Sequence, residues 1–188
     1  LTTFDVSESK AMAMSSGTES TFTSLSQTNK SGNALYAYAA IPTISRIALP
    51  STVLANGTTT LAKWSVSSGG TGTIGWIKSI FTVTPSAGVS VSSLSVWDAA
   101  SNTQITGGIS SSSNVVTFIA TNEQEISGAK NYYLKGTVSG TDGSSDSVVV
   151  TWNTGSTAYG ASAASSSAAT AGAGTASFVW TDQSLKSP

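Results

Sequence analysis

The sequence predicts an all-β protein, an antiparallel β-sandwich of Greek-key or jelly-roll type. Two observations carry this prediction: apolar and polar residues alternate in short runs, and turn residues separate these runs at intervals close to about 8–12 residues. A third is that no segment shows a sustained helical period with caps at both ends. At 188 residues the chain is long enough to bury a core without disulfides, and it contains no cysteine.

The clearest predicted strand covers residues 61–67. An Asn56-Gly57 step precedes it, and this dipeptide strongly favours a tight turn. Within the strand, Ala62, Trp64 and Val66 alternate with polar residues. We therefore expect Trp64 to be buried between the two sheets.

The longest predicted strand covers residues 74–84. Its two faces carry Ile77, Phe81 and Val83 on one side and Trp76, Lys78 and Ile80 on the other. Because both faces carry large apolar side chains, we expect this strand to be covered on both sides. The remaining predicted strands occupy residues 42–50, 89–98, 115–120, 132–139, 148–152 and 176–180. Residues 122–129 are compatible with one helical turn.

Two stretches fall outside this strand pattern. Residues 1–33 are rich in Ser and Thr with isolated apolar positions, and residues 155–175 are nearly all Gly, Ala and Ser. Segments of this composition bury too little apolar area to offset their own ordering entropy. We therefore divide the chain into an N-terminal extension, residues 1–33, and a sandwich domain, residues 34–188, with a small-residue loop at 155–175.

The charge content of the chain is very low. Charged residues make up 9% of the sequence, against about 25% in an average soluble protein, and the net charge is −1. This excludes the basic surface that nucleic acids or anionic membranes require. It also leaves little repulsion between neighbouring copies, so the surface fits contact with further copies of the same chain. A monomer kept soluble by glycans is the alternative.

The sequence also bears on where the protein resides. No apolar run approaches the roughly 20 residues of a membrane span, so we predict no membrane insertion. The chain begins with Leu1 and not with Met. We therefore expect that a leader sequence has been removed and that the protein is extracellular, at the cell surface.

No constellation of residues points to catalysis. The chain has no histidine, which removes the commonest general base, the commonest metal ligand and every Ser–His pair. Asp142 and Asp146 have the spacing that opens a calcium loop, but Ser147 replaces the turn glycine and Asn153 stands where a closing Glu is needed. A solvated turn is the simpler interpretation. We predict no catalytic residue, no cofactor, no metal site and no enzyme activity.

Several residues are candidates for other chemistry. Asn29 and Asn56 each begin an N-glycosylation triplet, and the many hydroxyls can carry O-glycans, so covalent glycans are candidates at both kinds of site. Lys63 and Lys135 fall on the polar faces of their strands, which argues against isopeptide bonds, because that chemistry needs a buried amine.

The five tryptophans are many for this length. Trp64 and Trp152 are expected in the core. Trp76, Trp97 and Trp180 are expected in the core or at a subunit interface, and two or three rings exposed together would instead form a platform for sugars.

Short motifs run through residues 40–182: PTI at 42–44, LPST at 49–52, NGT at 56–58, LAKWSV at 61–66, GTIGWIK at 72–78 and FVWTD at 178–182. Together they resemble a β-sandwich module that is common in secreted and surface proteins of candidate-phyla-radiation (Patescibacteria-type) bacteria. The matching motifs are structural. The resemblance therefore implies a surface protein with a sandwich fold, and it implies no active site.

This chain carries one such module behind its N-terminal extension. By analogy with donor-strand pili and TasA-like extracellular filaments, we expect a filament or pilus subunit whose N-terminal segment completes a sheet in the next copy. Such a head-to-tail contact does not close on itself and propagates a fibre. Leu1, Phe4 and Val6 are the predicted donor-strand residues. The alternatives are a monomeric carbohydrate-binding or adhesive surface module, and an S-layer subunit.

Overall fold

The computed structural model describes residues 10–12, 19–21, 38–143, 145–153, 157–159 and 175–184. The chain divides into two compact units, Leu1–Ala37 and Tyr38–Pro188. In the first unit, β1 (Lys10–Met12) pairs antiparallel with β2 (Glu19–Thr21). The predicted donor residues Leu1, Phe4 and Val6 and the predicted glycosylation site Asn29 lie outside the described residues.

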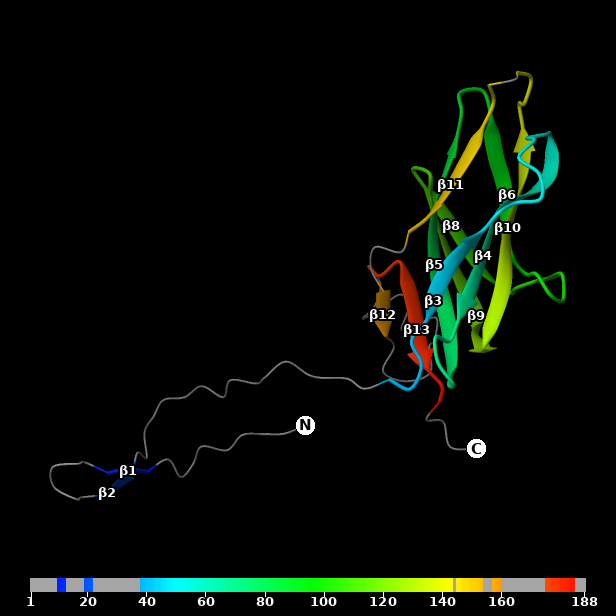
Figure 1. The fold of residues 1–188 in the computed structure, drawn as a ribbon. Helices are drawn as coiled ribbons and strands as arrows, with labels where there is room; N and C mark the ends of the chain where they lie inside the picture. The colour runs from blue at the N-terminus through cyan, green and yellow to red at the C-terminus, as the bar shows by residue number, and fades with distance from the viewer. Residues whose placement is uncertain are drawn as a thin grey trace. The chain divides into compact units, whose positions relative to one another are not determined.

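The second unit consists of two sheets that pack against each other, which confirms the predicted all-β sandwich (Figure 1). The first sheet contains, in spatial order, β3 (Thr43–Ile47), β4 (Gly57–Ser67), β10 (Ala129–Ser139), β6 (Ser90–Asp98) and β7 (Thr103–Gln104). The second contains β12 (Thr157–Tyr159), β13 (Phe178–Asp182), β5 (Thr73–Pro85), β9 (Val115–Ser127) and β8 (Gly107–Ser112), and β11 (Val148–Trp152) pairs with β5. The described strand pairs are antiparallel except β12–β13.

The helical turn considered for residues 122–129 is wrong. Strand β9 continues through this segment, where Gln124, Glu125 and Ile126 pair with β5, and the side chain of Ile126 is fully buried. Pairing with a central strand and burial of Ile126 therefore decide the conformation here. No described residue is helical.

The strict alternation expected along β5 is also wrong. It placed Trp76 and Phe81 on opposite faces, yet both rings contact the first sheet: Trp76 lies 5.2 Å from Tyr132, and Phe81 lies 5.0 Å from Trp64, between ring centroids. The pairing of β5 with β9 shifts register between Trp76 and Lys78. Because a bulge of this kind inverts the alternation, both rings face the core.

The core lies between the sheets and is rich in aromatic rings. Trp64 is only 3% exposed, which confirms the prediction that it is buried. The largest fully buried side chains are Trp76, Tyr132, Phe81, Phe118, Phe178, Ile74, Ile77, Ile126, Leu134, Val66, Val96 and Val116.

The long strands β5 and β4 differ in how completely one of their sides is paired. Two strands lie end to end along one side of β5: β13 pairs with it from Ile74 to Ser79, and β11 from Phe81 to Pro85. Along β4, strand β3 pairs only with residues 63–67. The chain then leaves β4 ahead of Pro50, which has no N–H to continue a ladder. Residues 57–62 of β4 therefore pair with β10 alone among the described strands.

Candidate assembly groove

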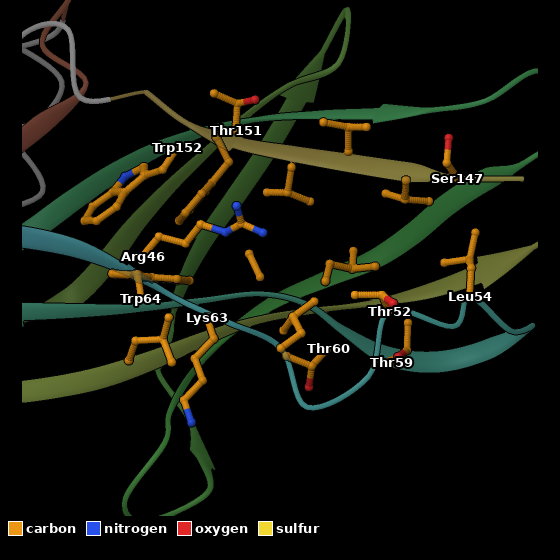
Figure 2. Close-up of a pocket in the computed structure, with 18 of the residues that line it drawn as sticks. Arg46, Thr52, Leu54, Thr59, Thr60, Lys63, Trp64, Ser147, Thr151 and Trp152 are labelled. Atoms are coloured by element: carbon orange, nitrogen blue, oxygen red, sulfur yellow. The ribbon is translucent and has the colours of Figure 1, made fainter.

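A groove of about 710 Å³ opens between the two sheets, at the side where residues 57–62 of β4 have no second neighbour among the described strands (Figure 2). Strand β11 of the second sheet forms one wall, and β3, β4 and the loop between them form the other. The residues that line it are Ile44, Arg46, Ile47, Leu49, Ser51, Thr52, Val53, Leu54, Thr59, Thr60, Leu61, Ala62, Lys63, Trp64, Phe81, Asp146, Ser147, Val148, Val149, Val150, Thr151 and Trp152.

Strand β11 presents an unpaired backbone edge to this groove. On its other side, two backbone hydrogen bonds extend the ladder with β5. The N–H of Asn153 donates to the carbonyl of Ile80 (2.9 Å), and the N–H of Ser86 donates to the carbonyl of Ser147 (2.8 Å). In an antiparallel ladder, alternate residues point their backbone groups toward the same neighbour. The N–H and C=O groups of residues 147, 149, 151 and 153 therefore face β5, and those of residues 148, 150 and 152 face the free edge.

The same three residues also line the groove with their side chains. Val148, Val150 and Trp152 are half-buried and pack on the core, while Val149 and Thr151 are exposed. The Trp152 ring lies 5.4 Å from Trp64. An apolar wall and free backbone hydrogen-bonding groups are thus combined in β11, which is what an added strand needs.

The loop at residues 48–56 borders the groove without pairing with β4. Asn56 holds its end by two hydrogen bonds: the side-chain oxygen accepts the N–H of Thr141 (2.9 Å), and the amide nitrogen donates to the Thr141 carbonyl (3.4 Å). Leu54 packs against the core, while Val53 is 83% exposed. Asn56 is itself exposed, and its glycosylation stays a prediction.

The groove carries opposite charges at its two ends. Figure 2 shows Arg46 at the end marked by Trp64 and Trp152, with its side chain extending over the groove. The Arg46 side chain is exposed, and it makes no hydrogen bond or ion pair with any described residue. Asp146 lies at the other end, beside Ser147. Its carboxylate accepts the N–H groups of Asp142 and Gly143, both at 2.8 Å.

These two hydrogen bonds also describe the segment that we compared with a calcium loop. The Asp146 carboxylate accepts hydrogen bonds from backbone N–H groups three and four residues earlier in its own turn. Within the described part of the chain, no three acidic side chains converge on a point where a metal ion could be held.

The tryptophans do not gather on one exposed face. Trp64, Trp76 and Trp180 are buried, as expected for the core, and Trp152 is half-buried in the groove wall. Trp97 is half-buried under the Lys135 ammonium, which lies 3.9 Å from the centre of its ring. The sugar platform that we considered is therefore not formed by the described tryptophans.

The two lysines examined for isopeptide bonds cover aromatic rings. Lys63 lies 5.2 Å from the centre of the Tyr133 ring and Lys135 also contacts it, at 5.8 Å. Both side chains are half-buried. Sequence reasoning missed a different lysine, Lys78, which is 3% exposed and whose pKa burial lowers.

Sequence reasoning also missed Arg46 and the free edge of β11. The only available signal for Arg46 was its place in a short strand between Pro42 and Pro50. The alternation at 148–152 predicted a strand, but a pattern within one strand does not reveal whether a second neighbour is present.

Comparisons with protein-family models, curated proteins and solved structures found no match. None of the described residues belongs to a helix long and apolar enough to span a membrane.

Proposed function

We propose that the protein is the structural subunit of an extracellular filament, and that it polymerises when an N-terminal strand of one copy fills the groove of the next. The observation that carries this proposal is the free edge of β11. Its backbone groups at 148, 150 and 152 are unpaired among the described residues, and they border a groove that apolar side chains line together with hydroxyl and charged groups. Such an edge binds an extended segment by backbone hydrogen bonds.

The size of the groove suits a short strand. Strand β11 has five residues, which corresponds to about 17 Å at roughly 3.3 Å per residue. An extended segment of five or six residues therefore covers it. Leu1 to Val6 has this length, and its Thr2, Phe4 and Val6 side chains fall on one face.

Two exposed apolar residues favour a second copy over the same chain as the source of the strand. Val53, in the loop wall, is 83% exposed, and Val149, on the outer face of β11, is 57% exposed. A six-residue strand inside the groove covers neither of them fully, whereas the domain of a neighbouring subunit does. The low charge of the chain, 9%, is consistent with such contacts.

The experiment compares Val150→Pro with Val150→Thr in the full chain. Proline removes the Val150 N–H, which points away from β5, so the ladder with β5 stays intact on an edge strand that tolerates proline. Threonine keeps both the N–H and the side-chain shape. We expect fibres in electron micrographs of the wild type and Val150→Thr, and a folded monomer for Val150→Pro, with circular dichroism as the check of folding.

A complementation arm identifies the donor. A chain that lacks residues 1–9 retains the groove, and Val150→Pro retains the donor segment. We expect each variant to be monomeric alone, and an equimolar mixture to give a 1:1 dimer by light scattering. A wild type that stays monomeric, or Val150→Pro fibres as abundant as those of Val150→Thr, would overturn the proposal.

A further inference from the structure

This inference rests on the proposed function and concerns the direction in which the donor strand enters. The groove lining contains two cations, Arg46 and Lys63, which lie on the paired parts of β3 and β4 beside Trp64, and one carboxylate, Asp146, at the Ser147 end. The Arg46 side chain has no hydrogen-bond or ion-pair partner among the described residues. A strand that enters the groove therefore meets a positive charge at one end and a negative charge at the other.

In the predicted donor segment and the residues that follow it, the charged side chains all come after Phe4. The first acidic residues are Asp5 and Glu8, and the first basic residue is Lys10. Asp5 lies between Phe4 and Val6, so its side chain points out of the groove when theirs point in. Arg46 is exposed, and its side chain extends over the groove (Figure 2).

We infer that the donor strand runs parallel to β11, from the Asp146 end to the Arg46 end, with Asp5 beside Arg46. The opposite direction brings Asp5 and Glu8 toward the carboxylate of Asp146 and leaves Arg46 unpaired. An exposed ion pair is weak. In the parallel direction, however, the attraction between Asp5 and Arg46 is gained and the repulsion from Asp146 is avoided, and the two effects together favour this direction by about tenfold. The groove thus selects an acidic segment in a fixed orientation.

Disulfide trapping in the 1:1 dimer tests the direction. Because the chain has no cysteine, single cysteines can be placed at Thr3 or Ser7 of the donor (in Val150→Pro) and at residues 147, 149, 151 or 153 of the acceptor (lacking residues 1–9). In the parallel arrangement, moving the donor cysteine from Thr3 to Ser7 moves the trapped acceptor position toward 153, whatever the register. A shift toward 147 overturns the inference and leaves the proposed function intact.

A charge reversal tests the role of Arg46 separately. We expect Arg46→Glu to weaken the dimer about fivefold, and Asp5→Lys in the donor to restore most of the loss. Lys130→Glu is the matched control, because it changes the net charge equally and Lys130, an exposed residue of β10, does not line the groove. Equal dimer affinities for Arg46→Glu and Lys130→Glu overturn the inference. Failure of the unmodified pair to form a dimer counts instead against the proposed function.

Discussion

Strand β5 runs through two halves of the sandwich, which differ in how many described strands lie beside it. In the half at Thr73–Ser79, β13 pairs with β5, and the rings of Trp76 and Phe178 are fully buried. In the half at Phe81–Pro85, β11 pairs with β5 but has no described second neighbour, and Trp152 is only half-buried. Among the described strands, β13 and β12 lie on one side of β5 in the first half, which we call the closed half, and β11 lies there alone in the second, which we call the open half.

Hydrogen bonds also link the closed half to the first residues of the sandwich unit. The Asp182 carboxylate accepts the N–H groups of Ala39 (2.7 Å) and Ala40 (3.4 Å), which ties the start of the sandwich unit to β13. Burial alone would raise the pKa of Asp182, but these bonds and those from Ser184 outweigh it and hold this pKa below its ordinary value. Under the proposed function, the closed half would supply stability and the open half would receive the donor strand.

The largest expected effect compares two tryptophans, one from each half. Trp76→Ala should lower the free energy of unfolding by about 3–5 kcal/mol, because it leaves a cavity in a packed core. Trp152→Ala should cost about 1–2 kcal/mol, because the ring lies in a groove wall that water already reaches. Urea denaturation measures both. Equal losses would mean that the halves are equally packed.

Much of the sandwich follows from alternation in the sequence. The strand at 61–67 and the burial of Trp64 were predicted because polar and apolar residues alternate there without interruption. The faces of β5 were not, because the pairing of β5 with β9 shifts register beside Trp76 and the alternation is inverted there, and this shift depends on a partner strand that is distant in the sequence. The helical turn at 122–129 failed for the same reason, since pairing with β5 outweighs local preference.

The groove could be predicted only in part. Prolines at 42 and 50 limit the length of β3, and this much is readable from the sequence. That β3 then covers only part of β4, and that β11 borders the resulting gap, depends on which strands are neighbours. Strand neighbours are set by contacts between segments distant in the chain. That Arg46 lines the same groove as Trp152, more than a hundred residues later in the chain, could not be predicted from the sequence.

A smaller effect tests the packing of the closed half with two glycines. Gly75 pairs with Thr181 in the closed half, and a Cβ at this position would overlap the Glu123 carboxylate, which accepts a hydrogen bond from the Thr181 hydroxyl. Gly75→Ala should therefore cost about 1–3 kcal/mol of unfolding free energy through overpacking. Gly108→Ala is the matched control, since nothing lies within 4 Å of its Cβ position.

The control should be neutral or stabilising by up to about 1 kcal/mol. Both variants should still assemble, because neither glycine lies near the groove. Thermal melts give the stabilities, and electron micrographs give the assembly. A Gly75→Ala variant as stable as Gly108→Ala would show that the Glu123 side chain can move aside for the added methyl group without loss of stability.

The smallest effect concerns Tyr132, whose ring contacts Trp76 of the closed half at 5.2 Å and Trp64 beside the groove at 5.9 Å. Burial raises the pKa of Tyr132 above its ordinary value. The folded protein therefore keeps the phenol neutral, while the unfolded chain ionises it near pH 10. The stability that depends on the neutral phenol is complete below about pH 10 and is lost as the pH rises further, by up to about 1.4 kcal/mol per pH unit.

Tyr132→Phe isolates this contribution, because the other tyrosines titrate in both proteins. We expect the difference in unfolding free energy between wild type and Tyr132→Phe to be constant from pH 7 to about pH 9.5. Above about pH 10, the wild type should lose stability relative to Tyr132→Phe. Urea titrations across this range measure it. A difference that stays constant to pH 11 would mean that Tyr132 ionises as readily in the folded protein as in the unfolded chain. Water from the groove would then reach the phenol, and the boundary between the open and closed halves would lie deeper, beyond Tyr132 and at Trp76.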